Sequence, residues 1–445
     1  MKVVSKANEA ILAILRKPKT TDGNYRKMQF CVENILDDGV LLFHTLTKEL
    51  LFLSHQEYDH HLELDYLREH WFVVPEETKD KEYSDLVKWV WANRQKKGKE
   101  IVSYSIFTTT DCNARCFYCF EADYKPVGMD AKTAEDVADY IIRNSNKAKP
   151  VRLHWFGGET LCNPKVIDII VNKLRENGFT FSSYITSNGL LFDREAAKKA
   201  KEEWNATTVQ ITLDGMNEEH NRRKNYAAYH GDAFETTVDH IRGLLDAGIV
   251  TMVRLNFDMG NLESIRTLTD YLQKEFAGNP NFSAYPAVLF EDCSAWNPDR
   301  LPEEQMALQE ELFRLRDEMQ EKRICFPRTL KRDLPLEHCG ANNHGHRTIL
   351  PDGRFTVCNN VGESNTYGSI YDGITDKEKY ERWTNNARIP GKCRSCSWLP
   401  ECTSFDQCPV KHSTCRQTEH DMMIRKLRKE YKKYLKMLAA QESES

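Results

Sequence analysis

The chain has 445 residues, 40% of them hydrophobic and 29% charged, and this length should hold two or three domains with ample core. A net charge of −5 and a pI near 6.3 provide no basic field, so the composition argues against nucleic acid as a partner. Residues 1–20 carry charges throughout and no run of about 18 apolar residues occurs, so neither a secretion signal nor a membrane span is expected. The fourteen cysteines are clustered, which favours metal binding in a reducing cytoplasm over disulfides.

Residues 1–98 are predicted to form a domain of their own, ending in an amphipathic helix over 80–97 that bridges to the next region. The other predicted elements are two strands within 41–53 joined at 47–49, a helix over 55–60 capped by Ser54, a helix over 63–70 and a strand over 71–74. Three strands followed by helices resemble the winged-helix recognition element of maturases that act on ribosomally made peptides. The resemblance implies that a leader peptide binds as an added strand at a sheet edge. The alternative is a packing domain without a ligand.

Strand-like and helix-like runs alternate through residues 99–320. The predicted strands are 102–107, 151–156, 181–186, 207–213, 250–257 and 283–289. The predicted helices are 131–146, 164–177, 193–204, 232–247 and 261–276. Such βα units imply a parallel α/β sheet with right-handed crossovers, and in barrel enzymes the chemistry lies at the C-terminal ends of the strands.

Three cysteines, Cys112, Cys116 and Cys119, follow the first of these strands in a C-x₃-C-x₂-C pattern. Three thiolates on one short loop can hold three irons of a [4Fe–4S] cube and leave the fourth iron open. The alternative is a zinc knuckle, which needs four ligands. No fourth Cys or His lies within fifteen residues on either side.

The second strand ends in Gly157-Gly158-Glu159. Together with the cysteine triplet, this sequence resembles the radical S-adenosylmethionine (SAM) enzymes. The resemblance implies a partial (β/α)₆ barrel of the TIM type, a [4Fe–4S] cluster on the triplet and SAM as cofactor. Thr212-Leu213-Asp214-Gly215, followed by His220 and Arg222, is similar to a stretch of peptide-modifying members of that family. The residues that would contact SAM by this resemblance are Tyr118, Gly157, Gly158, Glu159, Thr212 and Arg222.

Residues 321–415 carry a second group of cysteines. They are Cys339, Cys358, Cys393, Cys396, Cys402, Cys408 and Cys415. Their spacing resembles a SPASM domain, which implies two auxiliary [4Fe–4S] clusters, and the alternative is a pair of zinc ribbons. By that resemblance one cluster takes Cys393, Cys396, Cys402 and Cys415, and the other takes Cys339, Cys358 and Cys408. The last two gaps depart from the family pattern, so the assignment of Cys408 and Cys415 stays open.

The cluster on Cys339, Cys358 and Cys408 would have three cysteine ligands only. Its fourth iron is open, or is bound by His344, His346 or Cys325. Asp352-Gly353, between Cys339 and Cys358, predicts a hairpin turn. Residues 416–445 are predicted to form a charged helix with a disordered end over 441–445.

The resemblance as a whole implies a cytoplasmic radical SAM maturase. Its 5′-deoxyadenosyl radical would install an oxidative crosslink, thioether or carbon–carbon, in a precursor peptide with a leader. Its other partner would be a one-electron reductant of the flavodoxin or ferredoxin type, with no nucleic acid and no membrane. The alternatives are a formylglycine-forming sulfatase-maturating enzyme, a peptide epimerase and a non-catalytic iron–sulfur scaffold. In the sulfatase-maturating subtype an aspartate base follows the cysteine that matches Cys358, and here Asn359 stands there.

Overall fold

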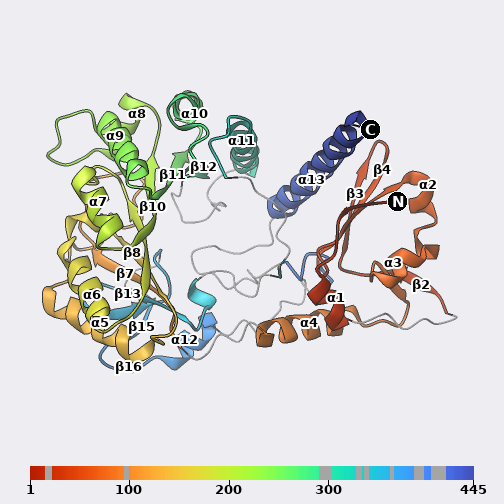
Figure 1. The fold of residues 1–445 in the computed structure, drawn as a ribbon, viewed down its shortest axis with the longest axis horizontal. Helices are drawn as coiled ribbons and strands as arrows, with labels where there is room; N and C mark the ends of the chain where they lie inside the picture. Colours follow the sequence, from red (N-terminus) through yellow and green to blue (C-terminus); the bar gives the residue numbers. More distant parts are fainter. Residues whose placement is uncertain are drawn as a thin grey trace.

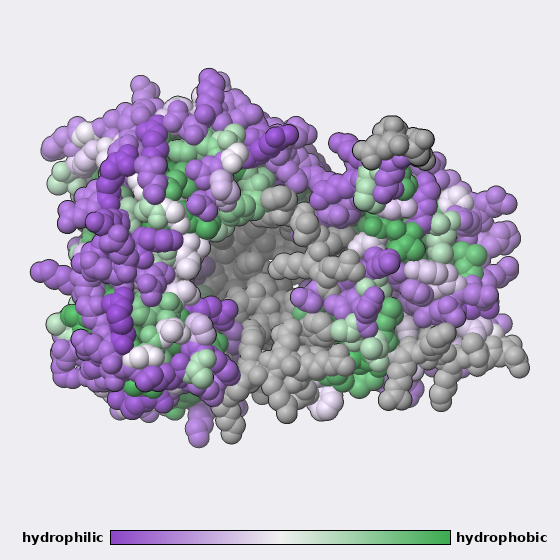
Figure 2. All heavy atoms as spheres, in the orientation of Figure 1, coloured by the Kyte–Doolittle hydropathy of each residue, from purple (hydrophilic) through white to green (hydrophobic). Residues whose placement is uncertain are grey.

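The computed structural model describes residues 1–15, 23–94, 100–289, 302–326, 333–334, 340–360, 365–384, 395–401 and 417–444. Figure 1 shows a large α/β body and a smaller N-terminal body, with helix α13 (Gln417–Glu444) between them. On the face drawn in Figure 2, the surface is hollowed between these two bodies. Five of the predicted auxiliary-cluster ligands, Cys339, Cys393, Cys402, Cys408 and Cys415, lie outside the described residues.

Six parallel strands form the barrel sheet at the predicted places. They are β7 (Ser103–Thr109), β8 (Val151–Gly157), β9 (Phe181–Ser187), β10 (Ala206–Leu213), β11 (Val250–Phe257) and β12 (Phe282–Val288). Each strand pairs in parallel with the next one along the chain. In β9 every second residue is buried, from Phe181 to Ser187. This alternation packs one face of the sheet against helices and turns the other face to the barrel interior.

The helices that connect these strands are amphipathic, and their ends differ from the predicted ends by at most two residues. They are α5 (Ala131–Asn144), α6 (Lys165–Glu176), α7 (Arg194–Glu202), α9 (Ala233–Asp246) and α10 (Leu262–Phe276). Asp130, Asp193 and Asp232 cap three of them by accepting backbone N–H groups of the first turn. The short helix α8 (Asn217–Lys224) is not among the predicted barrel helices, because it is polar all round and so lacks the apolar period of a surface helix.

The barrel sheet continues on the far side of β7. Strand β13 (His346–Ile349) pairs in parallel with β7, and β14 (Arg354–Thr356), β15 (Thr366–Ser369) and β16 (Gly373–Ile374) follow as antiparallel neighbours. The hairpin predicted from Asp352-Gly353 is confirmed, since Gly353 has a positive φ of 83° between β13 and β14. Part of the region predicted as a separate cysteine-rich domain therefore extends the barrel's own sheet. Helix α11 (Pro302–Glu321) follows β12, and α12 (Lys377–Thr384) follows β16.

The N-terminal body contains two antiparallel sheets. One has the order β1-β5-β4-β3, and the other pairs β2 with β6. The elements are β1 (Lys2–Ser5), α1 (Glu9–Leu15), β2 (Tyr25–Lys27), β3 (Cys31–Leu36), β4 (Gly39–His44), β5 (Leu50–Ser54), α2 (His55–Asp59), α3 (Asp65–Glu69), β6 (Val73–Pro75) and α4 (Asp80–Arg94). The predicted strand pair within 41–53 is confirmed, as is the cap at Ser54, which forms a reciprocal capping box with Glu57. The winged-helix identity of this body stays a prediction.

Helix α13 connects the two bodies through opposite faces. Leu427 and Tyr431 pack against Leu41 and Phe52 of the N-terminal sheet. On the other face, Lys429 forms an ion pair with Asp317 of α11. The helix was predicted to be a solvated cover with a disordered end, but it is half-packed and continues to Glu444. Its Ala, Gln and Glu residues near the end have high helix propensity or cost little in a helix.

Residues 395–401 also dock onto the N-terminal body. The Lys48 ammonium, 1% exposed, forms an ion pair with Glu401, and Thr45 Oγ1 donates to the Ser397 carbonyl at 2.7 Å. Leu399 joins the apolar core of that body. The segment that carries Cys396 is thus held by the N-terminal body.

Candidate functional site

The cysteine triplet lies on the loop that leaves β7 at the C-terminal edge of the barrel sheet. Cys112, Cys116 and Cys119 are all half-buried. Burial raises the pKa of each thiol, and with smaller contributions from Glu159, Cys116 and Cys119 the pKa of Cys112 is raised to about 12. A bound metal cluster fits this loop, because positive charge stabilises thiolates that burial alone would disfavour.

Among the residues that the structure describes, no three His, Cys, Asp or Glu side chains converge as ligands of a single ion. Three thiols on one loop are compatible with ligands that each bind a separate iron of a cluster.

The Gly-Gly-Glu loop after β8 is bonded directly to the cysteine loop. Gly158 N–H donates to the Thr109 carbonyl at 3.0 Å, and Glu159 N–H donates to the Asp111 carbonyl at 2.9 Å. A Cβ atom on Gly157 would lie 2.1 Å from Thr109 O, and one on Gly158 would lie 2.4 Å from Asp111 O. Both glycines are thus required where the backbones of the two loops meet, and Gly157 also has a φ of 138°.

Glu159 is fully buried and binds three protein donors. Its carboxylate accepts Ser187 Oγ–H at 2.9 Å, Leu161 N–H at 3.0 Å and Asn188 N–H at 2.7 Å. Burial raises the pKa of this carboxyl, while these hydrogen bonds lower it. A carboxylate can accept about four hydrogen bonds, so an acceptor position remains for a further donor.

A second polar cluster lies at the end of β10, beneath the cysteine loop. Lys224 Nζ donates to Thr212 Oγ1 at 2.8 Å and to Tyr118 OH at 2.9 Å, and lies 3.5 Å from Asp214 Oδ2. The Tyr118 hydroxyl donates to Asp214, and Asn256 Nδ2 donates to Asp214 Oδ1 at 3.1 Å. An ammonium group has three donors, and Lys224 uses two of them in its hydrogen bonds to Thr212 and Tyr118.

The charge of Lys224 is stabilised although its side chain is only 4% exposed. Burial lowers its pKa, but the Asp214 carboxylate and nearby groups raise it to a net value above the usual one. The pKa of Tyr118 is raised by burial and by Asp214, so its hydroxyl stays protonated. The cluster therefore places a fixed ammonium beside the Thr212 hydroxyl, next to the cysteine loop.

Not all of the predicted SAM-contacting residues lie near the cysteine loop. Tyr118, Gly157, Gly158, Glu159 and Thr212 surround the cysteine loop through the contacts above. Arg222 is 63% exposed on its side chain and forms a bidentate pair with Glu219 at 2.7 and 2.9 Å. It lies on the outer face of α8, whereas Lys224, two residues further on, faces the site.

Lys224, Asn188 and Asn256 were missed by the sequence analysis. Asn188 Nδ2 donates to Asn113 Oδ1 of the cysteine loop at 2.6 Å. Asn188 and Asn256 lie at the ends of β9 and β11, so their positions after barrel strands could have indicated them. Lys224 ends a polar helix, where nothing in the local pattern distinguishes a buried lysine from an exposed one.

Two predicted auxiliary-cluster ligands are described, and both are half-buried: Cys358 after β14, and Cys396 on the segment docked to the N-terminal body. Among the candidate fourth ligands, His346 already contacts Ser103 Oγ at 3.0 Å and Thr348 Oγ1 at 3.3 Å through its two ring nitrogens. His344 is exposed and contacts Tyr380 OH at 3.1 Å through Nδ1, which leaves Nε2 for another partner.

Comparison with known proteins agrees with this geometry. Residues 106–272 match the Radical SAM superfamily. The chain contains a radical SAM domain. Such a domain implies a [4Fe–4S] cluster and SAM as cofactors. The matched residues 106–272 include the cysteine loop, the Gly-Gly-Glu loop and the polar side chains of Thr212, Asp214 and Lys224.

Curated relatives match part of the chain. The chain is 28% identical to a probable GTP 3′,8-cyclase of Methanocaldococcus jannaschii, over 40% of this chain and 57% of that protein. It is 26% identical to the Fe-coproporphyrin III synthase of Methanosarcina barkeri, over 40% of this chain and 42% of that protein. The matches thus span about half the length of these relatives.

Solved structures match more of the chain. Native anSMEcpe with bound AdoMet has a TM-score of 0.57 at 15% identity, covering 75% of this chain and 98% of that one. Streptococcus suis SuiB bound to the precursor peptide SuiA has a TM-score of 0.51 at 13% identity, covering 87% of this chain and 96% of that one. At these identities the likeness establishes an α/β radical SAM fold with a parallel sheet.

No helix within the described part of the chain is both long enough and apolar enough to cross a membrane.

Proposed function

We propose that this protein is a radical SAM maturase that oxidises a ribosomally made precursor peptide and installs a thioether or carbon–carbon crosslink. The buried side chains of Thr212, Lys224 and Asp214 carry the proposal, because they place a charged ammonium group and a hydroxyl group beside the cysteine triplet at the barrel's C-terminal edge. The peptide substrate is supported by the fold match along 87% of the chain to a protein solved with a precursor peptide.

Cys112, Cys116 and Cys119 would hold the [4Fe–4S] cluster. SAM would lie between this cluster and the polar side chains at the end of β10. Lys224 and Thr212 would bind the carboxylate of SAM, since a buried ammonium and a hydroxyl together form charge-assisted bonds. The remaining acceptor position of Glu159 would receive the SAM amino group. When bound, the cluster and SAM supply the radical chemistry, and the chain orients them and excludes water.

The N-terminal sheet would bind the leader of the precursor. In the order β1-β5-β4-β3, strand β3 is an edge strand, and an extended peptide can add to such an edge. Its exposed Ile35, at 72%, would contact the incoming strand. Hydrogen exchange tests this: amides of residues 31–36 should become protected on addition of a precursor peptide, whereas unchanged exchange there would contradict the leader site.

Auxiliary [4Fe–4S] clusters on the C-terminal cysteines would accept the electron that the substrate radical must lose. Iron analysis of the anaerobically reconstituted chain should give roughly twelve irons, and about eight after replacement of the three loop cysteines by alanine. A count near four, or zinc in place of iron, would contradict the auxiliary clusters.

The reaction itself is tested with a precursor peptide, SAM and a one-electron reductant of the flavodoxin type. Each modification should remove about 2 Da from the peptide, since two hydrogens leave, and should consume SAM stoichiometrically. An unchanged mass with a D-residue in the product would show an epimerase instead. Formylglycine in the product would show sulfatase-type chemistry, for which the neutral Asn359 offers no base.

A further inference from the structure

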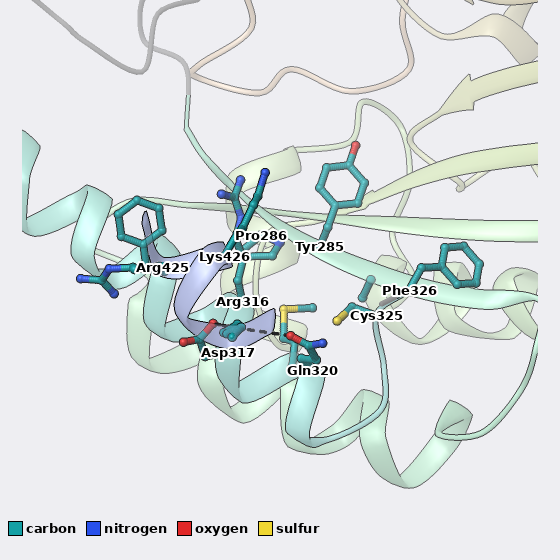
Figure 3. A pocket seen from close by; sticks show the side chains of 13 residues that line it. Tyr285, Pro286, Arg316, Asp317, Gln320, Cys325, Phe326, Arg425 and Lys426 are labelled. Atoms are coloured by element: carbon teal, nitrogen blue, oxygen red, sulfur yellow. Dashed lines mark hydrogen bonds and ion pairs between the residues drawn. The ribbon is translucent and has the colours of Figure 1, made fainter. Parts of the chain in front are cut away.

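A pocket of about 70 Å³ lies beside the last strand of the barrel. Figure 3 shows Tyr285 and Pro286 of β12 at its edge, together with side chains of α11, residues 325–326 and α13. Three consecutive residues of β12, Ala284 to Pro286, line it. Because successive side chains of a strand point to opposite faces, such a pocket lies along the strand's edge.

The outer edge of β12 is only partly paired, because Pro286 lacks a backbone N–H group. Ala284 N–H donates to the Ile324 carbonyl at 2.6 Å, and Phe326 N–H donates to Ser283 Oγ at 3.0 Å. Residues 324–326 therefore run beside β12. Pro286 is the next residue on the outward side and has no N–H, so the backbone pairing cannot continue past it.

Tyr285 joins the pocket to the barrel interior. Its hydroxyl donates to Gln210 Oε1 at 2.6 Å, and the Tyr184 hydroxyl donates to the same oxygen at 2.9 Å. Gln210 lies two residues before Thr212 on β10, and thus on the same face of that strand. Tyr285 therefore lies between the pocket and the face of β10 that carries Thr212.

The lining combines an apolar floor with a cationic rim. Phe313, Met319 and Phe326 belong to the floor. Four cationic side chains line the pocket against the single carboxylate of Asp317, which pairs with Lys429. Arg316 and Lys426 have further contacts. Arg425 is exposed at the pocket, and its guanidinium group lies over the Phe313 ring at 4.6 Å.

We infer that this pocket binds the substrate peptide through an apolar side chain flanked by acidic residues. The inference rests on the proposed function, in which the substrate is a peptide. An apolar side chain fits the floor, and carboxylates complement Arg425 at the rim. The location supports this occupant, because α13 packs its opposite face, Leu427 and Tyr431, on the N-terminal sheet that would hold the leader. The pocket thus lies between the leader site and the barrel interior.

Photo-crosslinking of the full-length, reconstituted protein tests the inference. The probe is a capped peptide with a benzophenone side chain between two aspartates, and its matched control has lysines in place of the aspartates. The acidic probe should label Phe313 or Phe326, as located by mass spectrometry, and the lysine probe should label these residues at least about fivefold less.

Arg425→Glu should weaken labelling by the acidic probe by roughly five- to tenfold. The matched control is Lys436→Glu, the same charge change on an exposed residue of α13 outside the pocket, and it should have no effect. Melting temperatures verify that both variants are folded. Equal labelling by the two probes, labelling elsewhere, no labelling, or an unaffected Arg425→Glu would each overturn the pocket assignment.

The outcome is separable from the proposed function. A precursor that still loses about 2 Da while the pocket is not labelled would refute the pocket alone. A pocket labelled as expected, with every precursor left unmodified, would refute the maturase and leave an acidic-peptide site.

Discussion

The barrel and the N-terminal body both rest on apolar strands, but their important contacts have different origins. In the barrel, the residues of the site follow strand ends: the triplet follows β7, Glu159 follows β8 and Asn188 follows β9. In the N-terminal body, the contacts that fix its position come from the far end of the chain. Thr45 meets Ser397 across 352 residues of sequence, and Lys48 meets Glu401 across 353. Local sequence therefore determines where a barrel site lies, whereas docking of the second body depends on long-range packing.

The largest effect is expected where residues 395–401 dock onto the N-terminal body. Lys48→Met should lower the free energy of unfolding of this junction by about 3 kcal/mol, because it leaves the Glu401 carboxylate, 14% exposed, without its partner. Hydrogen exchange should accelerate over residues 395–401 and stay unchanged in strands β7 to β12. The matched control is Lys432→Met, on an exposed position of α13. Equal exchange in the two variants would show that the ion pair does not hold the segment.

A smaller but more specific effect is expected inside the barrel. Lys224→Met should weaken SAM binding by roughly 10- to 150-fold, which corresponds to the loss of about 1.5–3 kcal/mol from one charged hydrogen bond. Arg222→Met should change the affinity less than about twofold, because that side chain is exposed and already paired with Glu219. Calorimetric titration of both reconstituted variants gives the comparison. A larger loss with Arg222→Met would restore the assignment made from the sequence.

Acid should affect the N-terminal body through His44. Burial lowers the pKa of this histidine from 6.5 to about 4, so the folded body holds it neutral. Between pH 6.5 and 4 the unfolded chain binds more protons, and stability should therefore fall as the pH decreases, by at most about 1.4 kcal/mol per pH unit from this residue. Below about pH 4 its contribution should level off.

The measurement for His44 is thermal unfolding from pH 7.5 to 4.5, compared between the wild type and His44→Gln. The variant should be less stable at pH 7.5, because His44 accepts the N–H groups of Leu46 and Thr47 at 3.3 Å, but its pH dependence should be flatter. Parallel curves for the two proteins would assign the acid sensitivity to the barrel histidines His154 and His220, whose pKa values burial lowers to about 3.

The sequence was sufficient for most of the barrel because alternating βα units have a strong local period. The same reasoning located the cysteine loop and Thr212, which follow directly from strands. It did not indicate how α8 presents Arg222 and Lys224, since both belong to a polar helix and only the fold decides which one turns inward. It also failed for α13, where a highly charged helix buries Leu427 and Tyr431 through contacts with strands some 380 residues earlier in the chain.

The glycines of the Gly-Gly-Glu loop show a third kind of limit. Their identity suggested close approach to a ligand, and close approach is what the structure has, but the partner is the backbone of the cysteine loop. The sequence indicated that no side chain fits at these two positions, but it did not indicate which neighbouring atoms lie there. Because the two loops pack directly against each other, a substitution at Gly158 is expected to disturb the triplet as well as the proposed cofactor site.

The central claim is that the cysteine loop, Glu159 and the Thr212–Lys224 cluster form one site that cleaves SAM. Its most direct test is 5′-deoxyadenosine formation by the anaerobically reconstituted full chain with dithionite and SAM, beside a Cys116→Ala variant. The account predicts steady formation by the wild type and none above background by the variant, since one lost thiolate removes a cluster ligand. Equal formation by both proteins, or none by a wild type that carries its full iron content, would contradict it.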